Sequence, residues 1–264
     1  MGDLAALRAG LRSLDRVVVA FSGGADSAFL AWVANDELGP ARARAVTAVS
    51  PSLAPEEEIE CGALAGEWGL RWTPVVTDEL ASADYARNDG ERCYHCKVEL
   101  MSAVGPIADA EAATVVLGVN VDDLGDHRPG QRAAAERGAQ FPLVDAGFTK
   151  DDVRAASLAL GLRTWDKPAA ACLASRVPYG TPVTLSVLRE VASAESGLRA
   201  LGFRQLRVRH YGDLARLEIS LDELDTVLAR RDAVVAAVQA AGYRYVTLDL
   251  EGFRSGNLNA ALGG

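Results

Sequence analysis

Three short stretches of the sequence combine residue types and spacings that suit chemistry. The run SGGADS occupies residues 22–27, and ERCYHCK, residues 91–97, places Cys93 and Cys96 three positions apart. A further cysteine, Cys172, lies in KPAAACLASR, residues 167–176. The first stretch suits the binding of an anion by backbone amides, and the other two supply thiols for metal binding or redox exchange.

The glycine-rich run is typical of an anion-binding turn. Gly23 and Gly24 let the backbone approach a ligand closely, several amide N–H groups point the same way, and the helix that follows presents its positive end. Ser22 and Ser27 add hydroxyl donors, and Asp26 is suited to position a metal ion or the first turn of the helix. The run is neither a Walker loop nor a G-x-G-x-x-G motif. A plain tight turn is the alternative.

The cysteines allow several interpretations. Four cysteines at irregular spacing are too few for a disulfide framework, and in a reducing compartment a paired-cysteine motif more often binds metal or is redox-active. A zinc site at Cys93, Cys96 and Cys172 with a fourth ligand such as His95, a reversible disulfide, and simple packing all stay open. Cys61 falls in an expected amphipathic helix, where we expect a small buried side chain.

The composition restricts the classes of partner. The chain of 264 residues has 27 basic and 36 acidic side chains, and the net charge of −9 gives no uniform positive field that would collect nucleic acid. The amino terminus lacks the basic start and apolar stretch of an export signal, and no apolar run approaches the ~20 residues that span a bilayer. We expect a cytoplasmic protein that binds neither membrane nor nucleic acid.

Secondary-structure patterns predict elements that would position these residues. Short, nearly continuous apolar runs alternate with helical stretches, which indicates a doubly wound α/β fold with a parallel sheet and a ligand site at the carboxyl ends of its strands. The expected strands are 16–21, 43–49, 72–76 and 113–119. The expected helices are 25–38, 55–68, 94–110, 130–138 and 150–160, the last with Thr149 and Asp152 in capping-box spacing.

A second, smaller domain is expected after the Pro- and Gly-containing stretch 177–184. We place the boundary so that residues 1–180 form the main domain and residues 181–264 a small α+β domain. Its expected elements are a helix at 185–201, strands at 203–210 and 214–220, a helix at 222–241 and a strand at 243–250.

Polar residues follow two of the expected strands at the edge where ligands bind in such sheets. Ser50 ends the second strand and is placed to lie near an adenosine. Asn120 and Asp123, in GVNVDDLGDHRPG (118–130), could orient a substrate or a metal ion, and Arg128 could meet a phosphate or carboxylate. An acidic solvated loop is the alternative interpretation of this stretch.

The run Ser-Gly-Gly-x-Asp-Ser between a strand and a helix resembles the pyrophosphate loop (PP-loop) of the N-type ATP pyrophosphatases. This resemblance implies cleavage of ATP between its α and β phosphates, with Mg²⁺ screening the phosphates. Several further stretches resemble the LarE family, ATP-dependent sulfur insertases of nickel-pincer cofactor synthesis. They are ERCYHCK, GVNVDDLGDHRPG, KPAAACLASRVPYGTPVT (167–184), RVRHYGDLARLE (207–218) and GFRSGNLN (252–259).

The LarE resemblance implies a small-molecule mononucleotide substrate. ATP would adenylate a carboxylate of pyridinium-3,5-biscarboxylic acid mononucleotide, releasing pyrophosphate, and sulfur would then displace AMP to leave a thiocarboxylate. Adenylation makes chemical sense because a carboxylate at neutral pH is a poor electrophile. The resemblance also implies a homo-oligomer, such as a hexamer.

The same resemblance assigns roles to the cysteines. Cys172 matches the cysteine that donates sulfur, and in one branch of the family this residue is sacrificed and ends as dehydroalanine. Another branch uses three cysteines to hold a [4Fe-4S] cluster whose open iron carries sulfide from an external source. Cys93, Cys96 and Cys172 match the second branch, and thiolates are the usual cluster ligands. The sacrificial route stays an alternative.

Arginine and glutamate side chains complete the candidate site. Arg176 closely follows Cys172 and offers a fixed fork for an anionic substrate. Arg207 and Arg209 alternate along an expected strand and share one face. With Glu195 and Glu218 they match family positions for a phosphate or metal site, whereas a salt-bridged surface strand is the alternative.

Two other functions compete with sulfur insertion into a mononucleotide. A tRNA thiolase of the same superfamily also joins this type of loop to three cysteines, and binding of tRNA would favour it. A non-catalytic nucleotide-binding module would need neither pyrophosphate release nor Cys172, so retention of the full biological effect in Cys172→Ala would favour that interpretation.

Overall fold

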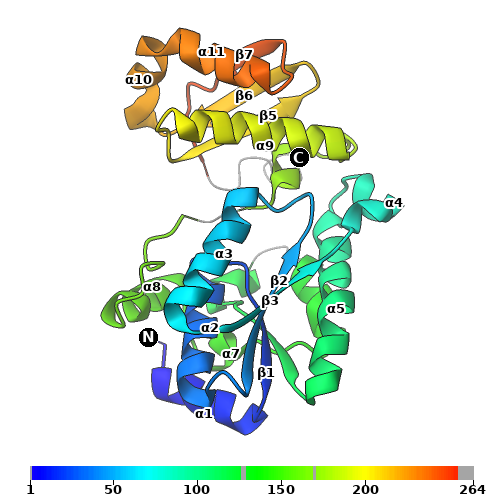
Figure 1. Ribbon diagram of the computed structural model, residues 1–264, viewed down its shortest axis with the longest axis vertical. Coiled ribbons are helices and arrows are strands. Elements are labelled where there is room, and N and C mark those ends of the chain that lie inside the picture. The colour runs from blue at the N-terminus through cyan, green and yellow to red at the C-terminus, as the bar shows by residue number, and fades with distance from the viewer. Residues whose placement is uncertain (1, 126–128, 169–170, 255–264) are drawn as a thin grey trace. The chain divides into compact units, whose positions relative to one another are not determined.

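The structure is a computed structural model that describes residues 2–125, 129–168 and 171–254 (Figure 1). The chain divides into two compact units. The first unit comprises Met1–Ser50, Pro55–Glu79 and Cys93–Ala170, and the second comprises Pro51–Ala54, Leu80–Arg92 and Ala171–Gly264. This division places residues 171–180 and two short earlier segments with the C-terminal part, whereas the sequence pattern puts the boundary after residue 180.

A four-stranded parallel sheet forms the centre of the first unit. Its strand order is β3-β2-β1-β4, and Val17 of β1 pairs with Ala43 of β2 and Thr114 of β4. The bounds are β1 Val17–Ala20, β2 Ala43–Val49, β3 Arg71–Val76 and β4 Thr114–Leu117. The expected α/β class with a parallel sheet is confirmed. The strand order reverses between β1 and β4, the point where such sheets bind ligands.

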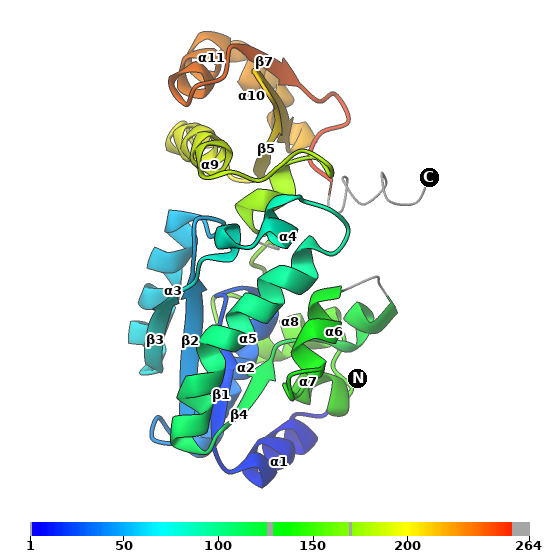
Figure 2. The ribbon, with the colours of Figure 1, turned by 90° about the vertical axis from the view of Figure 1, so that its right-hand side faces the viewer.

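Helices cover both faces of this sheet, as Figure 2 shows. Val17 and Val19 pack with α1, α2 and α3, whereas Val18 points to the opposite face and packs with α5, as the alternation of strand side chains requires. The helix bounds are α1 Leu4–Leu14, α2 Ala25–Leu38, α3 Pro55–Trp68, α5 Arg92–Glu111, α6 Pro129–Ala135, α7 Pro142–Asp145 and α8 Lys150–Ala159. The expected capping box of α8 is present.

Two features of the first unit differ from the sequence expectations. Helix α1 was not among the expected helices, although Asp3 caps its first turn and Leu7 and Leu11 on one face are buried. Strand β3 is an edge strand and is not buried on both faces, and the side chain of Val76 is 88% exposed. An edge position also accommodates Pro74, which cannot donate a hydrogen bond to a neighbouring strand.

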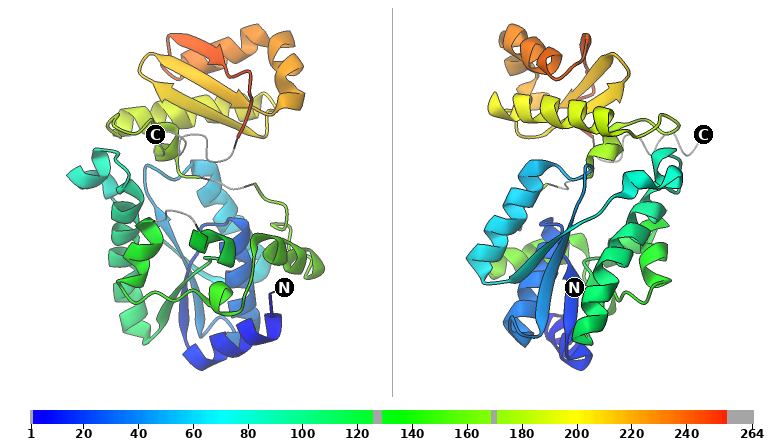
Figure 3. Two further views of the ribbon diagram at one scale, coloured as in Figure 1. Left: turned by 180° about the vertical axis from the view of Figure 1, so that it is seen from behind. Right: turned by 45° about the vertical axis from the view of Figure 1, so that its right-hand side comes forward.

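The second unit has a three-stranded sheet with α9 (Leu185–Ala200) and α11 (Arg231–Ala240) packed against it (Figure 3). Strands β5 (Leu206–Tyr211) and β6 (Leu214–Ile219) are antiparallel, and β7 (Tyr245–Leu248) is parallel to β6. The single helix expected at 222–241 is wrong. Helix α10 (Leu224–Ala229) ends where Arg230 leaves helical geometry, with φ −109° and ψ 22°.

Short helices complete the described chain. They are α4 (Ala83–Ala86), η1 (Glu79–Ala81), η2 (Val121–Gly125), η3 (Leu173–Arg176) and η4 (Leu221–Glu223). Within residues 2–125, 129–168 and 171–254, no helix is both long enough and apolar enough to cross a membrane.

Candidate functional site

The glycine-rich turn joins β1 to α2 and leaves the start of the helix open. Gly23 has a φ of 70°, which favours glycine, and a Cβ at this position would lie 2.9 Å from the Sγ of Cys61. Gly24 is the N-cap of α2 and supplies no side-chain acceptor to the first helical turn. The backbone amides of this turn are therefore available to an anion, because a helix begins with N–H groups that lack partners within the helix.

Two serines brace the turn. The backbone N–H of Ser22 donates to the Oγ of Ser27 over 3.2 Å, and the two hydroxyl oxygens are 2.9 Å apart. Ser27 also donates to the carbonyl oxygen of Gly24 over 3.2 Å. These bonds hold the turn in one conformation, which lowers the entropy lost when its amides bind a ligand.

Residues that follow β4 meet the turn at the point where the strand order reverses. The Nδ2 of Asn120 donates to Asp26 over 3.1 Å, and the backbone N–H of Asn120 donates to Asp123 over 3.3 Å. The other carboxylate oxygen of Asp123 pairs with the Nζ of Lys150 at 3.1 Å. The structure thus brings Asp26, Asn120 and Asp123 together, whereas Arg128 lies outside the described residues.

The electrostatics of this group favour a cation beside the turn. Burial raises the pKa of Asp26, and the charge of Asp123 raises it further, although the hydrogen bond from Asn120 acts in the opposite direction. Asn120 is fully buried, and within the described chain its Oδ1 accepts no hydrogen bond. Carboxylate and amide oxygens are ligands that suit Mg²⁺, and a bound cation would favour the ionised form of Asp26.

Ser50 follows β2 at the same edge of the sheet. Its hydroxyl donates to the Oε1 of Glu79 over 2.6 Å. Glu79, at the end of the segment that follows β3, is only 3% exposed. This carboxylate was not predicted from the sequence, because nothing in the local pattern indicates that it is buried against Ser50.

Two of the candidate cysteines lie near the start of α5. Cys93 is exposed and Cys96 is partly buried, and their spacing puts them one turn apart on the helix. Cys61 is buried as expected, and burial raises the pKa of its thiol to about 11. Among the residues that the structure describes, no group of three or more His, Cys, Asp or Glu side chains is arranged to hold a metal ion.

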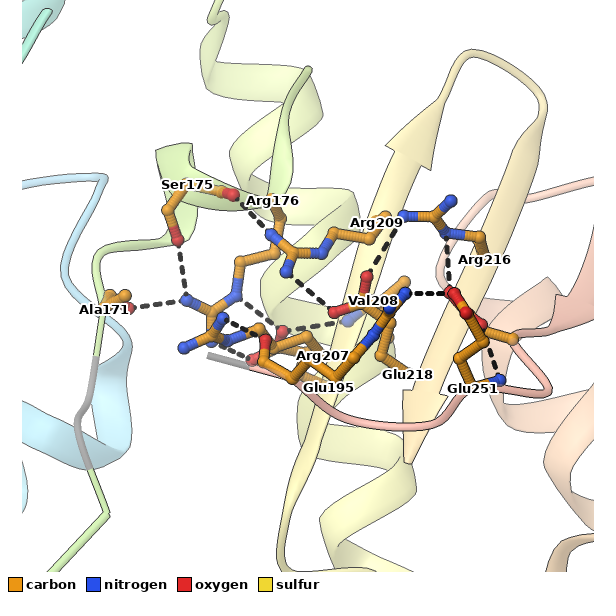
Figure 4. A network of polar contacts seen from close by, with 12 residues as sticks. Ala171, Ser175, Arg176, Glu195, Arg207, Val208, Arg209, Arg216, Glu218 and Glu251 are labelled. Atoms are coloured by element: carbon orange, nitrogen blue, oxygen red, sulfur yellow. Dashed lines mark hydrogen bonds and ion pairs between the residues drawn. The ribbon is translucent and has the colours of Figure 1, made fainter. Parts of the chain in front are cut away.

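In the second unit, Arg176 links Glu195 to the backbone at Ala171 (Figure 4). Its guanidinium donates to both carboxylate oxygens of Glu195, over 2.8 and 3.0 Å. It also donates to the carbonyl oxygens of Ala171 and Cys172, over 2.7 and 3.2 Å. Arg176 and Glu195 are 5% and 0% exposed, so this two-bond pair is buried and rigid.

A second buried pair lies between neighbouring strands of the small sheet. Arg209 of β5 donates to Glu218 of β6 over 2.7 Å and to the carbonyl oxygen of Ser175 over 2.8 Å. Glu218 also accepts from Arg216 over 3.1 Å. The alternative of a surface strand is wrong, because Arg209 and Glu218 are 1% and 0% exposed.

Arg207 is a buried arginine of β5 beside the other two arginines of this site. It is 6% exposed, donates to the carbonyl oxygen of Arg254 over 3.4 Å and lies 4.7 Å from the ring centre of Phe253. Among the described residues no carboxylate forms an ion pair with it. Burial and the charges of Arg176 and Arg209 lower its pKa to about 10, so it stays protonated at neutral pH and can receive an anion.

Asn88 and Arg92, which were not predicted from the sequence, donate to backbone carbonyl oxygens that follow Cys172 in the chain. Arg92 donates to the carbonyl oxygen of Ala174 over 2.8 Å and to the Oδ1 of Asn88 over 2.5 Å. Asn88, fully buried with a φ of 57°, donates to three carbonyl oxygens, those of residues 177, 178 and 181. The backbone around Cys172 is therefore fixed from within the second unit.

Comparisons with known proteins bear on the family. No protein-family model matches the chain. The chain is 46% identical over 259 residues to an uncharacterized protein of Synechocystis sp., with 97% of this chain and 96% of that protein covered. It is 40% identical to the pyridinium-3,5-bisthiocarboxylic acid mononucleotide synthase of Lactiplantibacillus plantarum, also over 259 residues, with 98% and 94% covered. An uncharacterized protein of Methanocaldococcus jannaschii is 25% identical over 241 residues, 91% of each chain. Since the identity to the named synthase extends over nearly the whole of both chains, the protein belongs to the LarE family.

Proposed function

We propose that the chain is an ATP-dependent sulfurtransferase that converts a carboxylate of pyridinium-3,5-biscarboxylic acid mononucleotide to a thiocarboxylate, a step in nickel-pincer cofactor synthesis. The name of the Lactiplantibacillus plantarum relative supports the substrate class. The observation that carries the ATP chemistry is the glycine turn at the uncapped start of α2, beside the buried Asp26. This arrangement supports the proposal, because amides at a helix start bind phosphate and a carboxylate can bind Mg²⁺.

The first step would activate the carboxylate. A carboxylate oxygen attacks the α-phosphorus of ATP, the bond from that phosphorus to the oxygen that bridges to the β-phosphorus breaks, and pyrophosphate leaves with the electron pair. The amides of the turn would bind the leaving phosphates. Asp26, Asn120 and Asp123 present the oxygens that would hold Mg²⁺, which screens the phosphate charge when bound.

The second step would deliver sulfur in the region of Cys172. A sulfur nucleophile attacks the acyl carbon of the adenylate, and AMP leaves with the electrons of the carbon–oxygen bond. Arg176 and Arg92 hold the backbone around Cys172 by the hydrogen bonds described above. Arg207 keeps a charge that no described carboxylate pairs, which supports a role in binding the phosphate of the mononucleotide.

We further propose that Cys93, Cys96 and Cys172 hold a [4Fe-4S] cluster. Their thiolates are the donors that such clusters take, and three of them leave one iron open for exchangeable sulfide. The support for a shared role is that all three cysteines occur in stretches that resemble the family, ERCYHCK and KPAAACLASR. We also expect a homo-oligomer, which sedimentation velocity would measure.

Metal analysis tests the cluster. Protein purified or reconstituted without oxygen should contain about four irons per chain and absorb broadly in the visible range, and Cys93→Ala should lose both properties. Zinc without iron under the same conditions would refute the cluster. A fall of about 34 Da at Cys172 after turnover would instead indicate the sacrificial route, since cysteine then loses hydrogen sulfide.

Turnover tests the function as a whole. We expect wild-type protein with the dicarboxylate mononucleotide, ATP, Mg²⁺ and sulfide to form pyrophosphate, AMP and the thiocarboxylate, followed by mass spectrometry. Cys172→Ser should still form pyrophosphate but yield no thiocarboxylate. ATP cleavage that does not depend on the mononucleotide, with no sulfur in the product, would contradict the proposal.

A further inference from the structure

Lys167 lies beside the glycine-rich turn, although it was not among the residues expected to bind ATP. Its Nζ is 3.7 Å from the point where a Cβ on Gly23 would be placed. The ammonium donates to the Oε2 of Glu57, in the first turn of α3, over 2.7 Å. The side chain of Lys167 is only 16% exposed, so the ion pair holds the charge in a defined position next to the turn.

The charges around the turn indicate that a bound polyphosphate needs a cation on the side of α3. Asp26 and Asp123 lie on the side of β4, where Lys150 pairs with Asp123. On the side of α3, Cys61 has a pKa of about 11 because of burial and is a neutral thiol at pH 7. Lys167 therefore supplies the positive charge next to Gly23. Polyphosphate bound at the turn would be repelled by the acidic groups unless cations offset them.

We propose that Lys167 binds the pyrophosphate portion of ATP and stabilises it as a leaving group. This inference rests on the proposed function, because it assigns one more catalytic residue to the same site. An ammonium group has three donors, so Lys167 can keep its bond to Glu57 and donate another to a phosphate oxygen. Glu57 is then a positioning residue, and Gly23 puts no side chain between the turn and the ammonium.

The contribution is electrostatic and needs no proton transfer. When the bond between the α-phosphorus and the bridging oxygen breaks, the electron pair and its negative charge go to pyrophosphate. A fixed ammonium stabilises that developing charge more than it stabilises bound ATP. Loss of one such preorganised donor lowers kcat on the order of 10²-fold. Binding of AMP should not change, because AMP lacks the phosphates that Lys167 would contact.

Binding and cleavage assays on matched variants test the proposal. The variants are Lys167→Met, Lys167→Arg and, as control, Arg163→Met. Arg163 is on the same segment and also pairs with α3, through Glu60 at 2.5 Å and Glu67 at 2.7 Å, but its side chain is 44% exposed. Calorimetry with Mg²⁺ would measure binding of inorganic pyrophosphate, AMP and α,β-methylene ATP, which cannot be cleaved between its α and β phosphates.

We expect Lys167→Met to bind pyrophosphate and the methylene analogue about tenfold more weakly, which corresponds to the loss of one charge-assisted hydrogen bond. Its affinity for AMP should be unchanged, its kcat for ATP cleavage should fall on the order of 10²-fold, and Lys167→Arg should recover part of both losses. Arg163→Met should behave as wild type. Circular dichroism would confirm that each variant is folded.

Several results would overturn the proposal. Unchanged binding of pyrophosphate by Lys167→Met, an equal loss of AMP affinity, or the same defects in Arg163→Met would each show that Lys167 acts only as a structural contact. Wild-type protein that binds neither pyrophosphate nor the methylene analogue would also overturn it. Wild-type protein that binds both but cleaves no ATP would refute the proposed function and leave the Lys167 contact supported.

Discussion

Glu195 should be the residue on which the second unit depends most for stability. Its carboxylate accepts two hydrogen bonds from Arg176, one from Arg199 over 2.9 Å and one from the backbone N–H of Val208 over 3.1 Å. Replacing Glu195 by Ala leaves the guanidinium of Arg176, 5% exposed, without its carboxylate partner. It also releases the guanidinium that donates to the carbonyl oxygens of Ala171 and Cys172.

The magnitude follows from burial. Removing one partner of a buried ion pair typically costs about 3–5 kcal/mol, because the remaining charge is left without compensation. A loss of about 3 kcal/mol changes the unfolding equilibrium on the order of 10²-fold, a large part of the stability of a small domain. Arg199 is 34% exposed, so Arg199→Ala, which removes another partner of the same carboxylate, should cost less than about 1 kcal/mol.

The chain provides separate probes for the two units. All four tryptophans belong to the first unit, namely Trp32, Trp68, Trp72 and Trp165. Tryptophan fluorescence therefore follows unfolding of the first unit, and far-ultraviolet circular dichroism follows both. In urea, Glu195→Ala should show an early circular-dichroism transition that fluorescence does not report, whereas Arg199→Ala should match wild type.

A double variant distinguishes the cost of leaving one buried charge unpaired from the cost of removing the whole ion pair. Arg176→Met combined with Glu195→Leu replaces the buried charges by apolar groups and should regain most of the stability lost in Glu195→Ala. The reasoning would be refuted if the unfolding free energies of Glu195→Ala and Arg199→Ala differed by less than 1 kcal/mol. It would also fail if the early transition appeared in fluorescence, because the network would then support the first unit.

Three further predictions concern the turn and the C-terminal segment. Gly23→Ala should lower the unfolding free energy by about 1–3 kcal/mol in urea titrations, since φ is 70° and the new Cβ would meet Cys61. The control Gly24→Ala has an ordinary φ of −73° and should cost less than about 1 kcal/mol, which reflects the poorer N-cap that alanine makes. Asp26→Asn should raise the melting temperature at pH 7, because burial raises the pKa of Asp26 and disfavours its charge. That gain should shrink as the pH falls through the raised pKa toward the ordinary aspartate value near 4, where both side chains are neutral. Phe253→Leu should cost the second unit about 1–2 kcal/mol by circular dichroism in urea, because it removes the ring that faces the buried Arg207, and an unchanged transition would contradict that role.

Secondary-structure elements that depend on sequence signals within a few residues could be predicted well. The capping box of α8, the helix start after Gly24 and the parallel strands were readable because caps, glycine geometry and apolar periodicity act within a few residues. The break at Arg230 was missed because the flanking residues favour a helix on both sides. The edge position of β3 was missed because an apolar run does not reveal how many neighbours a strand has.

By itself, the sequence determined the glycine turn, the order of the main elements and the kinds of side chain available at the site. Only the tertiary structure decided which charges are buried and with what partners. It paired Lys167 with Glu57 across 110 positions of the chain and placed the guanidinium of Arg207 over the ring of Phe253. The physical reason is that backbone preferences depend on neighbours in sequence, whereas desolvation and ion pairing depend on neighbours in space, which form only when the elements pack.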